Sequence, residues 1–216
     1  MPTKAFCSWS GGKDSCLCMD RARREGIRIE SLFTMMELGG GVSRGHGTPI
    51  WALKRQAIAM DLPIVTQEAE WSDYENKFVA QMQQFRENGF DTAVFGDIDI
   101  ESRKEWEESV CKKVQFKAIL PLWKISRRQI VHEFISLGYQ ALIVVVKKSV
   151  LPSSFVGRVY NESLISELDA LGVDPCAEDG EFHTFVVDGP LFRHRVQFNA
   201  DGVIHGGGYA ILNLIP

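Results

Sequence analysis

Short apolar runs alternate with helix-period segments through the first 120 residues or so of the chain. The apolar runs predict strands, and they are residues 5–9, 27–36, 63–66, 92–95 and 116–120. Between them, apolar positions recur at helical spacing, as at Trp106, Val110 and Val114. Strands that alternate with helices imply right-handed crossovers, and therefore an α/β fold with a doubly wound, five-stranded parallel sheet.

Local signals predict where several helices begin. Thr48 is predicted to cap a helix, because threonine is favoured at the cap position and the next residue, Pro49, is favoured at the first helical position. Residues 72–75 (Ser-Asp-Tyr-Glu) and 126–129 (Ser-Arg-Arg-Gln) match the capping box, which satisfies two free backbone N–H groups. Asn161 is predicted to cap a later helix.

The pattern changes after residue 123. Further strands are expected at residues 141–146, 182–187 and 209–214, with Asp201-Gly202 as a hairpin turn signal. These features favour antiparallel pairing in a smaller α+β domain. We therefore predict two domains, at residues 1–123 and 124–216.

The composition is that of an ordinary globular protein, with 45% hydrophobic and 24% charged residues. The net charge of −4 argues against a broad nucleic-acid-binding surface. No apolar stretch reaches the roughly 18 residues that span a bilayer, and the N-terminus has no secretory signal pattern, so we expect a cytoplasmic protein without a membrane partner. The five cysteines have no zinc-site spacing and are expected to be buried free thiols.

The segment Ser8-Trp-Ser-Gly-Gly-Lys-Asp-Ser15 lies between the first predicted strand and the first predicted helix. A glycine-rich turn in this position presents backbone N–H groups at a helix N-terminus, where phosphate binds well. The Walker A loop is excluded, because Cys7 stands where it needs a glycine and Asp14 where it needs a hydroxyl. The dinucleotide-binding pattern is excluded because Gly11 and Gly12 are adjacent.

The hexapeptide Ser-Gly-Gly-Lys-Asp-Ser closely resembles the S-G-G-x-D-S PP-loop of the ATP pyrophosphatases. The resemblance implies a domain of the adenine nucleotide alpha-hydrolase-like (HUP) type. It also implies ATP as the ligand, bound by Ser8 and by the six loop residues, Ser10, Gly11, Gly12, Lys13, Asp14 and Ser15.

The chemistry of the loop suits this ligand. The glycines let the backbone wrap a pyrophosphate, Ser10 and Ser15 can donate to it, and Lys13 neutralises charge on the phosphates. Asp14 belongs beside a phosphate only if Mg²⁺ lies between them. If the strand order is 3-2-1-4-5, the ligand crevice lies beside strands one and four. Because the fourth strand ends at Gly96-Asp97, Asp97 is predicted to face the loop and to share the metal with Asp14.

Residues 174–192 (Asp-Pro-Cys-Ala-Glu-Asp-Gly-Glu-Phe-His-Thr-Phe-Val-Val-Asp-Gly-Pro-Leu-Phe) look like the signature of the diphthine–ammonia ligase family. Gly96-Asp97-Ile98, Pro121-Leu-Trp123 and Gly157-Arg158 fit the same family, so the resemblance covers essentially the whole chain. It implies an amide synthetase in which ATP activates a carboxylate as an acyl adenylate, pyrophosphate leaves, and ammonia forms the amide. In the namesake reaction the carboxylate belongs to diphthine, a modified histidine of translation elongation factor 2.

Two carboxylates and a histidine of this signature, Glu178, Glu181 and His183, lie within six positions. They suit an amine or cationic substrate, and Glu181 and His183 suit the transfer of the proton that an attacking ammonium loses. We predict that these three residues and Thr184 bind the acceptor substrate. His46, in a glycine-rich loop, is a predicted substrate-binding lid residue. The predicted catalytic residues are Lys13, Asp14, Glu181 and His183. The alternatives are a solvated strand edge for Glu178, Glu181 and His183, and an exposed loop histidine for His46.

Three features depart from the usual family pattern. Ala177 stands where the family usually has glycine, residues 102–104 replace a Tyr-Gln-Arg segment of archaeal and eukaryotic members, and the loop at residues 44–47 differs. The pattern is closer to bacterial relatives, which lack diphthamide and would modify another carboxylate.

Two other classes of function stay open: a tRNA thiolase, which would use a reactive cysteine such as Cys176, and a non-catalytic nucleotide sensor. No glutaminase domain fits in 216 residues. Free ammonia or a small amine is therefore the expected nitrogen source, and a homo-oligomer is left open.

Overall fold

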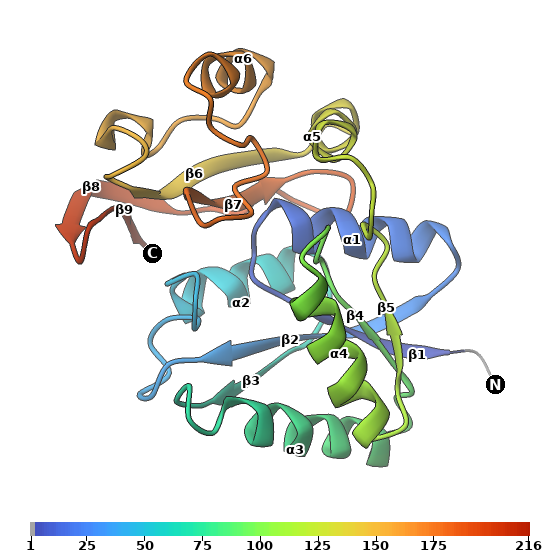
Figure 1. The fold of residues 1–216 in the computed structure, drawn as a ribbon. Helices are drawn as coiled ribbons and strands as arrows, with labels where there is room; N and C mark the ends of the chain where they lie inside the picture. The colour runs from blue at the N-terminus through green and yellow to red at the C-terminus, as the bar shows by residue number, and fades with distance from the viewer. Residues whose placement is uncertain (1–2) are drawn as a thin grey trace. The chain divides into compact units, whose positions relative to one another are not determined.

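The computed structural model describes residues 3–216 of the 216-residue chain and is drawn in Figure 1. The polypeptide divides into two compact units. The first contains the residues up to Ser10 and Asp14–Ile125, and the second contains Ser126–Pro216 together with the short segment Gly11–Lys13. The nucleotide loop predicted from the sequence is therefore divided between the two units.

The first unit is built on a five-stranded parallel sheet with the strand order β3-β2-β1-β4-β5. Its strands are β1 (Lys4–Ser8), β2 (Arg28–Met36), β3 (Ile64–Glu68), β4 (Thr92–Val94) and β5 (Lys117–Ile119). Its helices are α1 (Lys13–Arg24), α2 (Ile50–Ala59), α3 (Tyr74–Glu87) and α4 (Glu101–Lys113). The first residue of α1, Lys13, belongs to the second unit. The predicted doubly wound parallel sheet is confirmed, and its strand order is the one on which the predicted position of the ligand crevice depends.

Aromatic packing under α3 and α4 fixes one face of this sheet. The rings of Phe6 on β1 and Phe85 on α3 stack with centroids 4.7 Å apart, and those of Phe33 on β2 and Phe78 on α3 lie 5.0 Å apart. Figure 1 shows α3 and α4 on this side of the sheet, with α1 and α2 on the other. Helices on both faces explain why the strands read as nearly continuous apolar runs rather than as alternating patterns.

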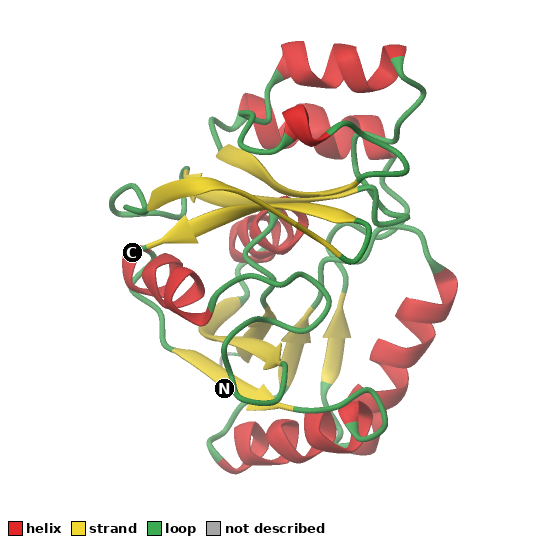
Figure 2. Ribbon diagram, turned by 90° about the vertical axis from the view of Figure 1, so that its left-hand side faces the viewer, coloured by secondary structure: helices red, strands yellow, loops and turns green. Residues whose placement is uncertain are grey.

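The second unit contains a four-stranded antiparallel sheet with the strand order β7-β6-β9-β8. Its strands are β6 (Gln140–Lys147), β7 (Phe182–Asp188), β8 (Asn199–Gly206) and β9 (Tyr209–Ile215). Two α-helices, α5 (Arg127–Ser136) and α6 (Glu162–Ala170), and the 3₁₀ turn η1 (Ser153–Phe155) complete it. The yellow strands and red helices of Figure 2 show this α+β arrangement, as the sequence predicts.

Two of the four predicted helix caps are confirmed. Ser126 and Gln129 form a reciprocal capping box at the start of α5, and the Asn161 side chain accepts from Leu164 N at the start of α6. The prediction for Thr48 is wrong by one residue, because Pro49 occupies the cap position of α2.

The capping box predicted at residues 72–75 is also wrong. Helix α3 begins at Tyr74 with Asp73 as its cap, and the Asp73 side chain makes no capping hydrogen bond. The polar side chains are used in the preceding turn instead, since Asp73 Oδ1 accepts from Glu70 N at 2.7 Å and the Ser72 hydroxyl donates to the Glu70 carboxylate at 3.3 Å.

The hairpin predicted at Asp201-Gly202 is a further error. Both residues lie inside β8, where the register with β9 is irregular between Ala200 and Val203. The turn between β8 and β9 falls at Gly207 and Gly208, whose φ angles are 55° and 85°. Two consecutive positive φ angles are what a tight two-residue hairpin turn requires, and two glycines adopt them most readily.

Within the described residues, no helix combines the length and the apolar character needed to cross a membrane. All five cysteines are free and buried, as the sequence predicts.

Candidate functional site

Buried hydrogen bonds fix the exit of the chain from β1 into the predicted nucleotide loop. Trp9, which directly follows β1, is 2% exposed. Its indole N–H donates to Gln56 Oε1 at 2.9 Å, and its carbonyl oxygen accepts from the Thr34 hydroxyl at 2.6 Å. These bonds give the loop a defined starting point at the carboxyl end of the strand.

Two hydroxyl groups of the loop converge in the first unit. Ser10 Oγ lies 3.1 Å from Ser15 Oγ, and Ser15 is 5% exposed in the first turn of α1. The first turn of a helix presents N–H groups and the positive end of the helix dipole. A phosphate at this point would therefore find hydroxyl donors beside a favourable backbone field.

The end of β4 lies against the same loop. A Cβ atom built on Gly96 would be 3.1 Å from the backbone carbon of Asp14 and 3.2 Å from the nitrogen of Ser15. Since side chains rarely approach backbone so closely, glycine allows the chain after β4 to pass directly beside the loop. Asp97, the next residue, is therefore carried to the edge of the loop.

Asp97 has partners of its own in the first unit. Its Oδ1 accepts from Arg103 Nη1 at 3.4 Å, and its carboxyl group shares a hydrogen bond with Glu107 of α4. Glu107 is 4% exposed. Burial, followed by the hydrogen bond to Asp97 and the charge of Asp97, raises the pKa of Glu107 to about 11, so this carboxyl group is protonated at neutral pH.

Sequence reasoning missed Glu107. Glu107 is followed by Glu108 in a segment with many charged residues, and the composition of that segment gives no sign that one of its carboxylates is buried. The available signal is its spacing, because Glu107 lies three and four residues before the buried Val110 and Cys111 and therefore on the same helix face.

In the second unit, Gly11–Lys13 contact the family signature. Val186 N donates to the Gly11 carbonyl at 2.9 Å, and Lys13 N donates to Thr184 Oγ1 at 3.0 Å. The Lys13 ammonium donates to the Cys176 carbonyl, and Lys13 as a whole is 4% exposed. Two predicted site residues, Lys13 and Thr184, are thus brought together although 171 positions separate them.

His183 of β7 lies near the same ammonium group. Burial, followed by the charge of Lys13, lowers the pKa of His183 to about 4. Its imidazole is therefore neutral at pH 7, which is the form that can accept a proton. Glu178 is 8% exposed, and Glu181 is half-buried with its Oε2 accepting from Asp179 N at 3.1 Å.

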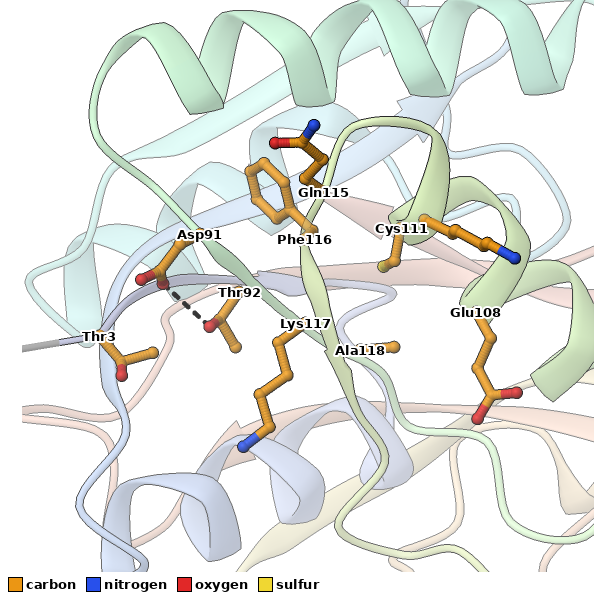
Figure 3. A pocket seen from close by; sticks show the side chains of 10 residues that line it. Thr3, Asp91, Thr92, Glu108, Cys111, Gln115, Phe116, Lys117 and Ala118 are labelled. Atoms are coloured by element: carbon orange, nitrogen blue, oxygen red, sulfur yellow. Dashed lines mark hydrogen bonds between the residues drawn. The ribbon is translucent and has the colours of Figure 1, made fainter.

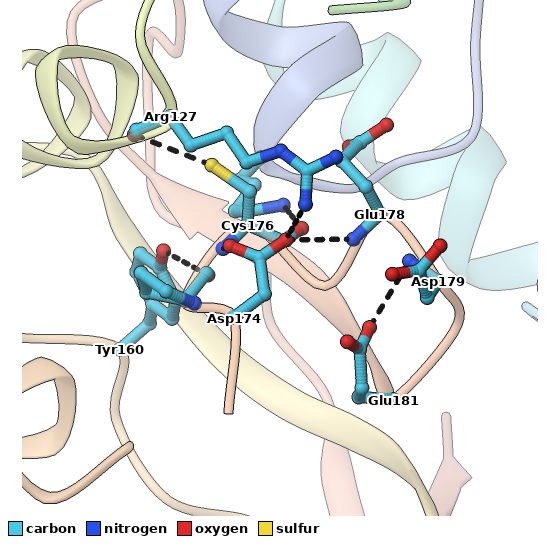
Figure 4. A network of polar contacts seen from close by, with 9 residues as sticks. Arg127, Tyr160, Asp174, Cys176, Glu178, Asp179 and Glu181 are labelled. Atoms are coloured by element: carbon cyan, nitrogen blue, oxygen red, sulfur yellow. Dashed lines mark hydrogen bonds and ion pairs between the residues drawn. The ribbon is translucent and has the colours of Figure 1, made fainter. Parts of the chain in front are cut away.

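A carboxylate organises the turn that carries Cys176 and Glu178 (Figure 4). Asp174 Oδ1 accepts from Cys176 N at 3.0 Å, and Oδ2 accepts from Glu178 N at 3.2 Å. Arg127 Nη1 pairs with the same Oδ2 at 2.6 Å, and the Tyr160 hydroxyl donates to the Pro175 carbonyl at 2.7 Å. The turn that precedes β7 is therefore held by these side chains, together with the backbone bond from Ala177 N to the Asp174 carbonyl at 3.0 Å.

Ala177 lies inside this turn with φ at 58°, the left-handed region that costs an L-residue about 1–2 kcal/mol. We expect Ala177→Gly to raise the free energy of unfolding by about 0.5–1 kcal/mol, after the added flexibility of the unfolded chain is deducted. Urea unfolding measures the change. Ala170→Gly, at the exposed end of α6, is the control and is expected to lower stability; an equal loss for both variants would contradict the strain at Ala177.

His46 lies in a hydrogen-bonded turn of the loop that follows β2. Ser43 N donates to the Thr48 carbonyl at 2.8 Å, and Thr48 N donates to Ser43 Oγ at 3.0 Å. The neck of this turn is therefore fixed, while the role of His46 in binding substrate stays a prediction.

Asp14 and Asp97 are the candidate ligands for the Mg²⁺ that the PP-loop resemblance implies. No group of three or more His, Cys, Asp or Glu side chains within residues 3–216 is arranged to hold a metal. Mg²⁺ that arrives with ATP needs only one or two protein carboxylates, because phosphate oxygens and waters fill its other positions. Asp14, in the first turn of α1, fits this need; Asp97 would have to exchange its bonds to Arg103 and Glu107 for the metal.

A pocket of about 670 Å³ lies elsewhere in the first unit (Figure 3). It is lined by Thr92 and Lys117, the first residues of β4 and β5, and by Glu108 and Cys111 of α4. The amino ends of the strands are opposite the ends that carry the loop and Asp97, so this pocket is separate from the candidate site.

Known proteins resemble the chain over nearly its whole length. Residues 3–118 match the family described as the diphthamide synthase N-terminal domain, and residues 126–207 match the diphthamide synthase C-terminal domain. Diphthine–ammonia ligase of Rattus norvegicus is 26% identical over 91% of this chain and 83% of the relative. The ligase of the same name from Danio rerio is 27% identical over 91% of this chain and 87% of the relative.

A solved structure is also similar, that of a predicted subunit of tRNA methyltransferase from Methanocaldococcus jannaschii. It has 14% sequence identity and a TM-score of 0.47, and the match covers 87% of this chain and 98% of that one. The family assignment rests on the two sequence matches, which account for both units. The chain therefore belongs to the diphthamide synthase family.

Proposed function

We propose that the protein is an ATP-dependent ligase that adenylates a carboxylate, releases pyrophosphate and passes the acyl group to ammonia. The observation that carries the proposal is the loop at the carboxyl end of β1, where the hydroxyls of Ser10 and Ser15 converge at the start of α1. The strand order reverses between β1 and β4, which is where doubly wound sheets bind nucleotides.

In this proposal the loop binds ATP and orients its α-phosphate. Ser8, the two glycines, Gly11 and Gly12, and the hydroxyls of Ser10 and Ser15 hold the phosphates, and Lys13 supplies positive charge. Mg²⁺, held by Asp14 and Asp97, would neutralise the phosphate oxygens and the pyrophosphate that leaves.

The signature segment supplies the acceptor side. Glu178, Glu181 and Thr184 are proposed to hold the acceptor, with His46 as a further contact. His183 is neutral at pH 7 and is proposed to accept the proton that ammonia loses on forming the amide.

The substrates are proposed from the relatives. The curated relatives are named diphthine–ammonia ligases, so diphthine on translation elongation factor 2 is the first carboxylate to test, and ammonia the first nitrogen source. We also propose a cytoplasmic location, and a division of labour between residues 1–123 for ATP and residues 124–216 for the acceptor.

Product analysis tests the reaction class. Protein incubated with ATP, Mg²⁺, ammonium and the diphthine-bearing factor, followed by a panel of other carboxylates, is expected to release AMP and pyrophosphate in equal amounts. Anion-exchange chromatography separates these products from ADP and phosphate. Release of ADP and phosphate would contradict attack at the α-phosphorus.

The tRNA thiolase alternative is not favoured. That chemistry requires an accessible nucleophilic thiol, but Cys176 is 1% exposed and its thiol donates to the Arg127 carbonyl at 3.3 Å.

A further inference from the structure

Lys13 enters the second unit as a buried cation. It is 4% exposed, its backbone N–H donates to Thr184 Oγ1 at 3.0 Å, and its ammonium donates to the Cys176 carbonyl. An ammonium group on four methylene carbons is flexible in water and loses that freedom only where a partner holds it. The Cys176 carbonyl is therefore one of the groups that fix where the charge of Lys13 lies.

The Cys176 carbonyl is not part of a strand or a helix. It belongs to a turn at residues 174–180, and an oxygen in such a turn is only as well placed as the groups that hold the turn. The Asp174 carboxylate receives the N–H of Cys176 at 3.0 Å and the N–H of Glu178 at 3.2 Å. These two bonds span the peptide unit whose carbonyl faces Lys13.

The Asp174 carboxylate is itself fixed. Arg127, at the first position of α5, pairs with its Oδ2 at 2.6 Å, and α5 starts with a complete capping box. The Tyr160 hydroxyl holds the neighbouring Pro175 carbonyl at 2.7 Å. A chain of contacts thus runs from a helix terminus through Asp174 to Cys176 (Figure 4), whose carbonyl accepts from the Lys13 ammonium.

We infer that Asp174 is a positioning residue for nucleotide binding, which acts by fixing the Cys176 carbonyl and through it the ammonium group of Lys13. The inference rests on the proposed function, in which Lys13 contacts the phosphates of ATP. An ammonium that is already in place when ATP arrives loses less freedom on binding than one that must first be ordered. Asp174 therefore strengthens ATP binding without touching ATP.

A double-mutant cycle tests this inference. Asp174→Asn keeps the size of the side chain, but its amide group replaces one of the two acceptor oxygens. Lys13→Met keeps the length of the side chain and removes its charge. The dissociation constant for MgATP is measured by titration calorimetry for the wild type, both single variants and the double variant.

We expect Asp174→Asn to raise the dissociation constant about three- to tenfold when Lys13 is present and less than about twofold in the Lys13→Met background. A residue with only a structural role would have the same effect in both backgrounds, and that additive result would overturn the inference. An unchanged or a lower dissociation constant for Asp174→Asn would also overturn the inference.

Asp169→Asn is the matched control. Asp169 lies on α6 in the same unit and pairs at 2.8 Å with Arg128, the residue after Arg127 on α5. Its side chain is 34% exposed, and it lies outside the turn at residues 174–180. It is expected to leave the dissociation constant unchanged. If Lys13→Met alone has no effect on ATP binding, the proposed role of Lys13 fails; if it has a large effect and the Asp174 change has none, only the present inference fails.

A second variant keeps the test decisive if Asp174→Asn unfolds. Arg127→Gln removes the ion pair but leaves both backbone bonds to Asp174, so a smaller weakening that again requires Lys13 is expected. Hydrogen exchange at the Cys176 and Glu178 N–H groups should become faster in either variant, and unchanged exchange in both would overturn the inference.

Discussion

Lys13→Met is expected to raise the dissociation constant for MgATP by about ten- to a hundredfold. Charge-assisted hydrogen bonds contribute about 1.5–3 kcal/mol each, and methionine fills the same space without any donor. Because Lys13 is 4% exposed, water has little access to take the place of the missing ammonium group. Titration calorimetry at fixed Mg²⁺ and ionic strength measures the change.

The control for this substitution is Lys54→Met, an exposed lysine on α2. It alters the net charge by the same amount and is expected to leave ATP binding unchanged. Equal affinity of the wild type and Lys13→Met would remove Lys13 from the nucleotide site and leave the hydroxyls and backbone of the loop as its remaining donors.

Glu107→Gln is expected to make the protein more stable than the wild type, by a margin that grows with pH. The pKa of Glu107 is raised from 4.5 to about 11 in the folded state. Between these values the folded protein holds a proton that the unfolded chain releases. The contribution of Glu107 is therefore fully present below pH 4.5 and falls by about 1.4 kcal/mol per pH unit above it.

Glutamine has no proton to lose, and its amide can still donate to Asp97, so the variant lacks this slope. Urea unfolding at pH 5, 6, 7 and 8 should show the two stability curves diverging as the pH rises. Glu108→Gln is the control, because the Glu108 side chain is 51% exposed and pairs with Lys104 at the surface. Parallel curves for the wild type and Glu107→Gln would show that Glu107 ionises normally in the folded protein.

Short-range patterns predicted the architecture of both units well. The alternation of apolar runs with helix-period segments predicted the parallel sheet, because helices connect parallel strands through right-handed crossovers. The strand order entered only as a condition, and the structure supplied it. The capping signals at Ser126 and Asn161 were also sufficient, because a helix cap depends on residues only three positions apart.

The local predictions failed where a second local structure used the same side chains. Asp73 and Ser72 bond to Glu70 rather than to the N–H groups of α3. Asp201-Gly202 has the composition of a turn, but the nearby Gly207-Gly208 adopts the two positive φ angles. In both regions the residue types suit more than one local structure, so their identity alone did not decide which one forms.

For the candidate site, the sequence by itself determined the loop and its chemistry, because the glycines, hydroxyls and charges of Ser10–Ser15 are contiguous. Only the tertiary structure decided which charged side chains are buried and what they contact. Lys13 meets Cys176 and Thr184 across more than 160 positions, and Glu107 is buried against Asp97 while its neighbour Glu108 is exposed. The physical reason is that the pKa and the freedom of a charged side chain depend on the solvent and charges around it in space, which residue identity and spacing along the chain do not specify.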